Sequence, residues 1–220
     1  MLDRSRQPID TGPSRPQRQA VSIRIAYCTK AKEYQQLVRT TNRDPLLPEI
    51  TFRRLEQSDL PMLTDWLAEP HLRRFYQKTP VTLEVVAREY GPVIRREEPS
   101  SSHLAFRNGE PFAYLQCYRN ADYPDWARVI DVADGISIDL FIGKPGYLRR
   151  GLGRSALRAY VQRVAFPLYA EEQRAYIGHD LTYTAALRCS EAAGFRPLRP
   201  FVEDGVEMVL LVINKSDPEV

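Results

Sequence analysis

The chain has 220 residues, a hydrophobic fraction of 43% and a formal net charge of +3, which fits one globular domain and leaves little room for two. Residues 1–48 carry a charge of +5 and residues 49–220 carry −2, so the main body is not expected to bind nucleic acid. No apolar run approaches the roughly 20 residues of a membrane span, and none resembles a secretory signal. We therefore expect a cytoplasmic protein without a membrane partner.

The cysteines and histidines are scattered along the chain. Their spacing matches neither a disulfide framework nor a zinc site, so we expect no disulfide and no bound metal. Buried or idle thiols and single, hydrogen-bonded imidazoles are the expected alternatives. The residues concerned are Cys28, Cys117, Cys189, His71, His103 and His179.

Two regions are predicted. Residues 1–48 form a basic extension, because the first 20 residues are rich in Arg, Gln, Pro and Ser and offer almost nothing to bury. Residues 21–48 carry a weak apolar pattern that fits a strand or a short helix. Regular patterns begin at Ile50, and residues 49–215 are expected to form the folded domain.

Residues 50–55 alternate as a strand does, and two amphipathic helices follow. Ser58 is the expected N-cap of the first helix, and Thr82 that of the second. Each helix repeats apolar residues at a helical spacing, which predicts one buried face. These faces comprise Leu60, Leu63 and Leu67 in the first helix and Val86, Tyr90, Val93 and Ile94 in the second.

The middle of the chain is predicted to be rich in strands. Asn108-Gly109 between two apolar runs signals a hairpin. Residues 119–135 are expected to form a loop that leads into a strand at residues 136–143. A long helix then follows, and its expected apolar face comprises Leu157, Tyr160, Val161 and Val164.

The last third of the chain contains a short strand at residues 175–180, a helix ended by Gly194, and a closing hairpin or pair of strands within residues 201–213. The predicted order is therefore one strand, two helices and three strands, followed by helix, strand, helix and two strands. This order predicts an α/β (α+β) sandwich built on a mixed sheet.

Two arginines and two glycines stand between the strand at 136–143 and the long helix, in YLRRGLGRSAL at residues 147–157. A glycine turn at the start of a helix brings unbonded backbone N–H groups and the positive end of the helix dipole to one point, which is a ready anion site. Taken alone, the motif fits a plain strand-to-helix turn about equally well.

The order of strand, glycine turn, long helix, short strand and a helix ending in AAGF resembles the GNAT superfamily of acetyl-CoA-dependent N-acetyltransferases, over about residues 50–213. The resemblance implies the GNAT fold, a mixed twisted sheet of about seven strands flanked by four helices, with acetyl-CoA as cofactor. Leu148 departs from the superfamily, which has Gln or Arg there. The residues implied to hold the coenzyme A pyrophosphate are Arg149, Arg150, Gly151, Leu152, Gly153 and Arg154.

Within the superfamily the chain is most similar to the aminoglycoside 6′-N-acetyltransferases. The similarity rests on FRRLEQSDLPMLTDWL, NGEPFAYLQCY, the ID of SIDLFIG, RGLG, ALRC and EDGVEM, in this order. It implies direct acetyl transfer to the 6′-amine of the drug, and hence antibiotic resistance, by a monomer or homodimer. Alternatives are a GNAT acting on a siderophore lysine, a polyamine or a protein N-terminus, and a non-catalytic GNAT-like binding module.

Asp139 is the candidate general base. A carboxylate inside an apolar strand is costly unless it is paired, which favours function, although alternation also allows it to face solvent with Ser137. The resemblance implies that Asp139 accepts the amine proton and that N–H groups of Phe141 and Ile142 bind the thioester oxygen. Where the superfamily has a tyrosine acid, this chain has Ser190, which is expected beside the cofactor.

Tyr183 is the candidate acid that protonates the leaving thiolate. Water, or departure of the thiolate without an acid, are the alternatives, and Tyr183 also fits a packing role. A polycationic drug further needs carboxylates and flat apolar surfaces, which residues 120–135 and the final hairpin supply. A solvated acidic loop explains this composition about as well. The substrate-binding residues implied by the resemblance are Phe75, Tyr76, Asp122, Trp126, Asp180 and Asp204, with His179, Glu203 and Glu207 nearby in sequence.

Overall fold

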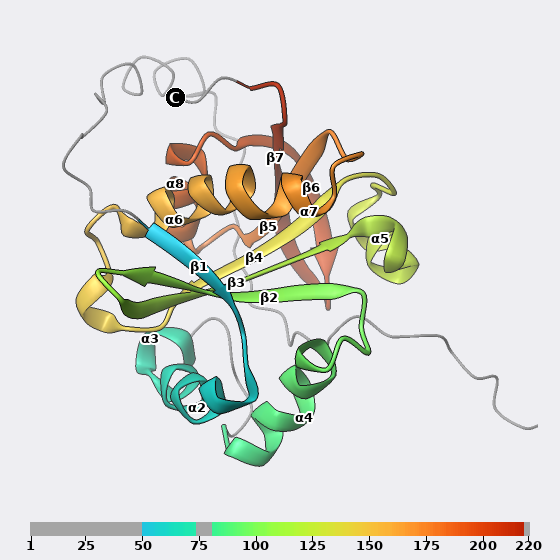
Figure 1. Ribbon diagram of the computed structural model, residues 1–220. Coiled ribbons are helices and arrows are strands. Elements are labelled where there is room, and N and C mark those ends of the chain that lie inside the picture. The colour runs from blue at the N-terminus through green and yellow to red at the C-terminus, as the bar shows by residue number, and fades with distance from the viewer. Residues whose placement is uncertain (1–49, 74–80, 218–220) are drawn as a thin grey trace, which may run out of the picture.

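The computed structural model describes residues 50–73 and 81–217, so the expected extension at residues 1–48 lies outside the described residues. The described chain forms one seven-stranded sheet in the order β1-β2-β3-β4-β5-β7-β6, with helices on both faces (Figure 1). The predicted α/β architecture and the number of strands are confirmed. The short helices α3 and α5 come in addition to the four main helices that the sequence predicts.

The strands pair in antiparallel fashion except for β4 and β5, which run parallel. The predicted hairpin joins β2 to β3, and its turn residues Asn108 and Gly109 have φ of 53° and 78°, as a two-residue type I′ turn requires. Asp204 and Gly205 make a similar turn between β6 and β7. The strands are β1 Ile50–Arg54, β2 Ser100–Arg107, β3 Glu110–Arg119, β4 Ile136–Ile142, β5 Arg174–Asp180, β6 Arg196–Glu203 and β7 Val206–Asn214.

Helices α6, α7 and α8 lie above the sheet in Figure 1, and α2, α3 and α4 lie below it. A π-helical turn, Val161–Ala165, joins α6 and α7 into one long helix. It directly precedes the segment with Pro167, which has no N–H to give to a regular α-helical ladder. The helices are α2 Leu60–Ala68, α3 Pro70–Arg73, α4 Leu83–Ile94, α5 Pro124–Ile130, α6 Leu152–Tyr160, α7 Phe166–Leu168 and α8 Thr184–Ala192.

The two faces of the sheet differ in chemistry. The face under α6 and α8 carries the main apolar core, in which Leu157, Tyr160 and Val161 are buried as predicted. On the opposite face, the predicted apolar side of α2 packs in a second cluster, and α5 covers a third. Polar side chains occupy the strands between these two clusters, and they form the candidate site.

One predicted helix cap is correct and one is wrong. Thr82 caps α4, because its Oγ1 accepts the N–H of Val85 at 3.3 Å. Ser58 does not cap α2. The chain instead makes a 3₁₀ turn before the helix, in which Glu56 and Asp59 each accept the other's backbone N–H.

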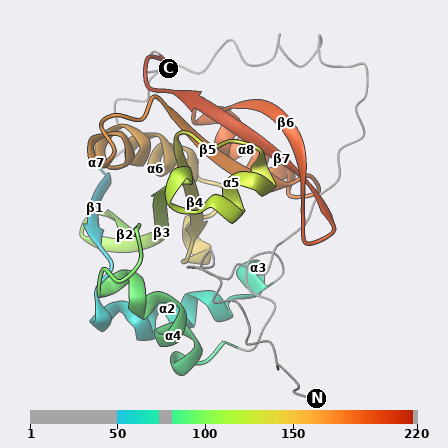
Figure 2. The same ribbon diagram turned by 90° about the vertical axis from the view of Figure 1, so that its right-hand side faces the viewer.

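The prediction of a loop at residues 119–135 is wrong in part. Pro124–Ile130 form α5, which begins with a proline at its first position and ends at Asp131 in the left-handed conformation, φ 51°. Figure 2 shows α5 in front of the sheet, close to the β6–β7 hairpin. The aspartates and the proline read as turn signals in the sequence, but here they begin and end a short helix.

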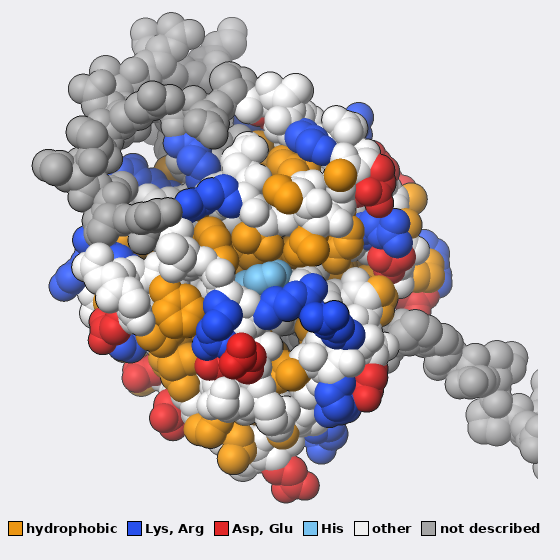
Figure 3. All heavy atoms as spheres, viewed as in Figure 1, with side chains coloured by type: hydrophobic (Ala, Val, Ile, Leu, Met, Phe, Trp, Pro, Cys, Tyr) orange, Lys and Arg blue, Asp and Glu red, His pale blue; other side chains and the backbone are white. Residues whose placement is uncertain are grey.

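The edge strand β1 is basic. Arg53 and Arg54 lie on it, and Arg163 donates from the π-helical turn to the Ile50 carbonyl at 2.7 Å. Figure 3 views the molecule from this side and shows Lys and Arg side chains gathered across the middle of the face. Charged side chains on an edge strand disfavour pairing with another sheet.

A buried polar chain links the sheet to α6. His103 Nδ1 lies 2.9 Å from the Tyr160 hydroxyl, which donates to Cys117 Sγ at 3.2 Å. Burial lowers the pKa of His103 to about 4 and raises the pKa of Cys117 to about 12. Cys117 is therefore the buried, idle thiol that the sequence predicts, whereas Cys28 lies outside the described residues.

The C-terminal end of β4 is held from the α2–α3 side by two contacts. A Cβ atom added to Gly143 would lie 1.9 Å from Trp66 Cδ2, so the indole packs directly on this backbone. His71 Nε2 lies 2.8 Å from the Ile142 carbonyl oxygen. Together they fix where β4 ends and the glycine turn begins.

Replacing Gly143 with alanine should lower the free energy of unfolding by about 1–3 kcal/mol, because the methyl group displaces Trp66 from a packed position. Urea denaturation of wild type and Gly143→Ala measures this. Gly146→Ala is the matched control, since nothing lies within 4 Å of its Cβ position. Equal stability of the two variants would show that the indole does not restrain β4.

Candidate active site

A strip of polar side chains crosses the sheet face that is turned away from α6 and α8. Ser102 on β2, Gln116 on β3 and Asp139 on β4 lie directly opposite one another in the strand register. Residues so paired project from the same face of a sheet. Asp139 does share this face with Ser137, as alternation allows, but the face is covered, and Asp139 is only 8% exposed.

Two more carboxylates are buried on the same face. Tyr176 is the partner of Ser137 in the parallel β4–β5 register, and Asp180 follows it at an even spacing, so it projects to the same side. Glu203 lies two residues after Phe201, which packs in the apolar cluster of this face. Both carboxylate residues are buried.

Trp126 of α5 is fixed to the same face by hydrogen bonds. Its Nε1 donates to Ser137 Oγ at 2.9 Å, and that hydroxyl donates to Asn120 Oδ1 at 2.6 Å. The Asn120 amide in turn donates to the Asp134 carbonyl at 2.8 Å. The indole also packs edge-on against Phe201, with ring centroids 5.8 Å apart. The ring is therefore a rigid apolar wall beside β4.

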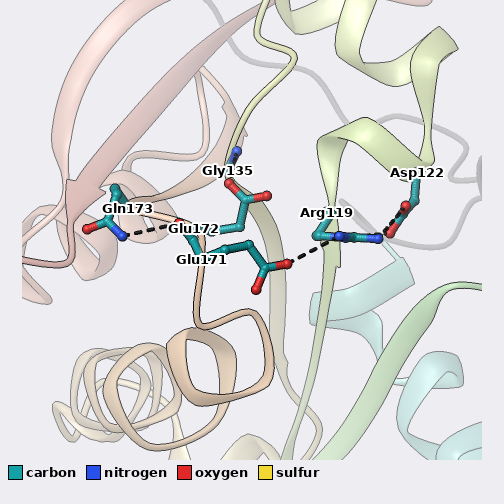
Figure 4. A network of polar contacts seen from close by, with 6 residues as sticks. All are labelled: Arg119, Asp122, Gly135, Glu171, Glu172 and Gln173. Atoms are coloured by element: carbon teal, nitrogen blue, oxygen red, sulfur yellow. Dashed lines mark hydrogen bonds and ion pairs between the residues drawn. The ribbon is translucent and has the colours of Figure 1, made fainter.

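All four acidic residues of segment 119–135 are engaged with arginines rather than gathered on this face. Asp122 accepts two hydrogen bonds from Arg119, both at 2.9 Å, and Arg119 also donates to Glu171 at 3.2 Å (Figure 4). Beside them, Glu172 accepts the Gly135 N–H at 2.7 Å. The remaining ion pairs are Asp125–Arg128, Asp131–Arg199 and Asp134–Arg174.

Of the substrate-binding residues expected from the sequence, the structure brings Trp126 and Asp180 to the polar face. Asp204 lies in the exposed turn between β6 and β7, one residue after Glu203. His179 points to the other face, where its Nε2 is 2.6 Å from Ser190 Oγ. The remaining two, Phe75 and Tyr76, lie outside the described residues.

Strands β4 and β5 separate after two residue pairs, Ile136–Ala175 and Ser137–Tyr176. The Gly143 N–H donates to the Phe112 carbonyl of β3 at 2.8 Å, so odd-numbered residues of β4 bond to β3 and even-numbered ones face the gap. The Ile142 N–H thus faces the gap, as does that of Leu140. The Phe141 N–H is directed at β3, and its ring stacks on Tyr114 at 4.9 Å.

The glycine turn lies against the end of β4, since a Cβ atom at Gly153 would lie 3.8 Å from Ile142 Cδ1. Gly151, at φ 73°, is the N-cap of α6, and Arg149 is also left-handed at φ 58°. The first helical bond runs from the Ser155 N–H to the Gly151 carbonyl, which leaves the preceding N–H groups of the first turn without helical partners. A Cβ atom at Gly153 would lie 2.9 Å from Cys189 Sγ, so α8 closes tightly on the turn.

The turn suits a phosphate-bearing ligand. Arg149 and Arg150 are exposed, and within the described part of the chain no ion pair or hydrogen bond engages the side chains of Arg149, Arg150 or Arg154. Three guanidinium groups, unbonded backbone N–H groups and a helix N-terminus at one point attract a diphosphate. Leu148 contributes no charge here, so the positive potential of the turn comes from the backbone N–H groups and the arginines.

Helix α8 and its N-cap position hold two of the predicted site residues: Tyr183, the candidate acid, and Ser190, expected beside the cofactor. Ser190 is buried and bonded to His179. Tyr183 is the N-cap residue of α8 and is half-buried. Burial raises the pKa of Tyr183, so the phenol stays protonated at neutral pH but is a weaker acid than an exposed tyrosine. Burial also raises the pKa of Cys189 to about 11, which keeps that thiol uncharged.

Comparison with known proteins agrees with this geometry. Residues 56–202 match the family model described as an acetyltransferase (GNAT) domain. This match spans more than half of the chain. The chain belongs to the GNAT acetyltransferase family.

Curated relatives and solved structures show which GNAT proteins this chain is similar to. Aminoglycoside N(6′)-acetyltransferase type 1 of Klebsiella pneumoniae, and its counterpart in Serratia marcescens, are 30% identical over 153 residues, 66% of this chain and 73% of theirs. The crystal structure of AAC(6′)-Ib with coenzyme A and kanamycin is 25% identical, with a TM-score of 0.65 over 76% of this chain and 95% of the other. This GNAT protein is accordingly an acyltransferase that uses acetyl-CoA.

Among the described residues, no group of three or more His, Cys, Asp or Glu side chains is arranged to hold a metal ion. Within residues 50–73 and 81–217, no helix combines the length and apolar character that crossing a membrane demands.

Gln116 is not among the site residues that the sequence predicts, and Asp204 is predicted as a substrate-binding residue ahead of Glu203. Gln116 is the one amide in the run YLQCY, two residues from Tyr114 and two from Tyr118, so strand alternation places it on the same face as both rings. A polar residue at that spacing in a buried strand was a usable signal. Glu203 and Asp204 are adjacent, and the sequence alone does not show where β6 ends and the turn begins.

Replacing Gly153 with alanine should weaken coenzyme A binding about tenfold or more, because the methyl group meets Cys189 Sγ at 2.9 Å and shifts the first turn of α6. Isothermal titration calorimetry with coenzyme A measures the affinity. The double variant Gly153→Ala/Cys189→Ala removes the clash and should recover most of it. A double variant as weak as the single one would contradict this explanation.

Burial lowers the pKa of His179 to about 4 from its ordinary 6.5, so the unfolded chain binds the proton more tightly. Stability should therefore fall as pH drops from 6.5 to 4, by up to about 3 kcal/mol from this group. Urea denaturation of wild type and His179→Gln across this range isolates the effect. The variant should show the smaller loss, and parallel curves would contradict the assignment.

Proposed function

We propose that this enzyme acetylates the 6′-amine of aminoglycosides. The observation that supports it most is the set of three buried carboxylate residues, Asp139, Asp180 and Glu203, on the sheet face that Trp126 borders. Several ammonium groups on one substrate can each find a charge-assisted partner there. The indole offers a flat apolar surface to a sugar ring. The curated relatives carry this activity in their names.

The reaction requires an uncharged amine beside an activated acyl group. Acetyl-CoA supplies that acyl group as a thioester, with the C–S bond breaking as the C–N bond forms. The carboxylate of Asp139 accepts the proton that the attacking nitrogen must lose. The gap-facing N–H groups of Leu140 and Ile142 would donate to the acyl oxygen, and the N–H groups at the start of α6 would hold the phosphates.

The leaving group needs a proton or a hydrogen bond. Tyr183 is the assigned donor, because it is the N-cap residue of α8, which packs beside the glycine turn. Ser190 of the same helix is held by its contact with His179. A thiolate is also stable enough near neutral pH to leave before it is protonated, so loss of the phenol should slow the reaction modestly.

Asp139→Asn should lower kcat for kanamycin at least about 100-fold, because the amide cannot accept the amine proton. Thiol release from acetyl-CoA measures the rate, and calorimetry should show unchanged coenzyme A affinity. Asp125→Asn is the matched control, since Asp125 is an exposed partner of Arg128 on α5. Wild-type activity in Asp139→Asn would remove Asp139 from the mechanism.

The same thiol-release measurement separates the alternatives. The expected result is turnover with kanamycin or tobramycin, with kcat/KM at least about 100-fold above that for spermidine or peptides. Turnover confined to spermidine or peptides would assign another amine and overturn the proposal. Coenzyme A binding without any turnover would indicate a binding module.

A further inference from the structure

The side-chain amide of Gln116 is buried at the centre of the polar strip, with 4% of the residue exposed. Its Oε1 accepts a hydrogen bond from the Tyr114 hydroxyl at 2.7 Å. Its Nε2 has no acceptor among the described residues. A buried N–H donor without a partner is costly, and native proteins retain few of them. We therefore expect a ligand atom to accept a hydrogen bond from this N–H group.

Neighbouring side chains hold the Gln116 amide in one orientation. The Tyr114 hydroxyl lies 2.7 Å from Ser102 Oγ, so a chain of hydrogen bonds runs from β2 through Tyr114 to Gln116. The Tyr114 ring is itself clamped, stacked on Phe141 at 4.9 Å and edge-on to Tyr90 at 5.4 Å. These contacts pre-organise the donor, so little conformational freedom is lost when a ligand binds.

The donor stands next to the catalytic carboxylate. Gln116 and Asp139 are directly opposite on β3 and β4, and their side chains share one face. Carboxylate oxygens accept but do not donate hydrogen bonds, which favours the amide N–H groups, rather than its oxygen, on the side of Asp139. An amine placed to give its proton to Asp139 thus brings its neighbouring substituents to Gln116.

We infer that Gln116 selects amines with an oxygen atom close to the reacting nitrogen, by donating from Nε2 to that oxygen. In a 6-amino sugar the ring oxygen is bonded to the carbon next to the aminomethyl group, and a hydroxyl lies one carbon further. An alkyl polyamine has no such acceptor and leaves the donor unbonded. A site built to hydrogen-bond a substrate group discriminates strongly against analogues that lack it.

This inference rests on the proposed function and deepens it. Gln116 touches the substrate and sets specificity. Tyr114 and Ser102 act only through Gln116 and are positioning residues. The hydroxyl of Tyr118, two residues away on the same face, is also buried without a described partner. It offers a matched change, because Tyr118→Phe removes a buried polar group on this face without touching the chain from Ser102 to Gln116.

The test compares kcat/KM for kanamycin and spermidine in wild type, Gln116→Met and Tyr118→Phe. Gln116→Met keeps the volume and removes both N–H groups. It should lower kcat/KM for kanamycin about tenfold and leave any rate with spermidine unchanged or higher. In Tyr118→Phe, the ratio of kcat/KM for kanamycin to kcat/KM for spermidine should stay within about threefold of its wild-type value. Coenzyme A affinity and thermal midpoint should not change in either variant.

A double-mutant cycle tests the role of Tyr114. Tyr114→Phe alone should lower kcat/KM for kanamycin a few-fold, and should have no further effect in the Gln116→Met background. Additive losses, or losses shared equally by kanamycin and spermidine, would indicate a purely structural role and overturn the inference.

The proposed function and the role of Gln116 can be contradicted by different results. A wild-type enzyme that does not acetylate kanamycin overturns the proposed function. A wild type active on kanamycin, together with an equally active Gln116→Met, leaves the function standing and overturns only the role of Gln116.

Discussion

The divergence of β4 from β5 is the constraint on which the site depends. Parallel strands that remained paired would use the N–H groups of Leu140 and Ile142 in the sheet ladder, and no backbone donor would face a thioester. The separation is possible because β4 is held elsewhere: by its full ladder with β3, by Trp66 on Gly143, and by His71 on Ile142. The part of β4 that has no partner strand on one side is thus stabilised by close packing around it.

The chemistry of the site follows from one face of the same sheet. The core side of the strands is apolar and meets α6 and α8, whereas the other side carries an amide and three carboxylate residues in an interior position. Burying these groups works against folding unless they are bonded. A cationic, hydroxylated ligand of the proposed kind would give both kinds of group further partners.

Much of the fold and some of the site could be predicted from the sequence. Asn108-Gly109, the Thr82 cap and the glycine turn are local signals, and local geometry fixes their structure. The partner of Asp131 and the choice between Glu203 and Asp204 depend on tertiary structure: Arg199 meets Asp131 across 68 positions. Alternation assigns Asp139 to a face, but only the packed helices show that this face is buried.

The polar strip draws its members from β2, β3, β4, β5 and β6, so no contiguous fragment contains it. Ser102 and Glu203, at its two ends in sequence, reach one sheet face only after the whole sheet has assembled. The polar strip is therefore a property of the cooperative unit and not of any subdomain. A bound ligand should protect backbone amides from hydrogen exchange across every strand at once.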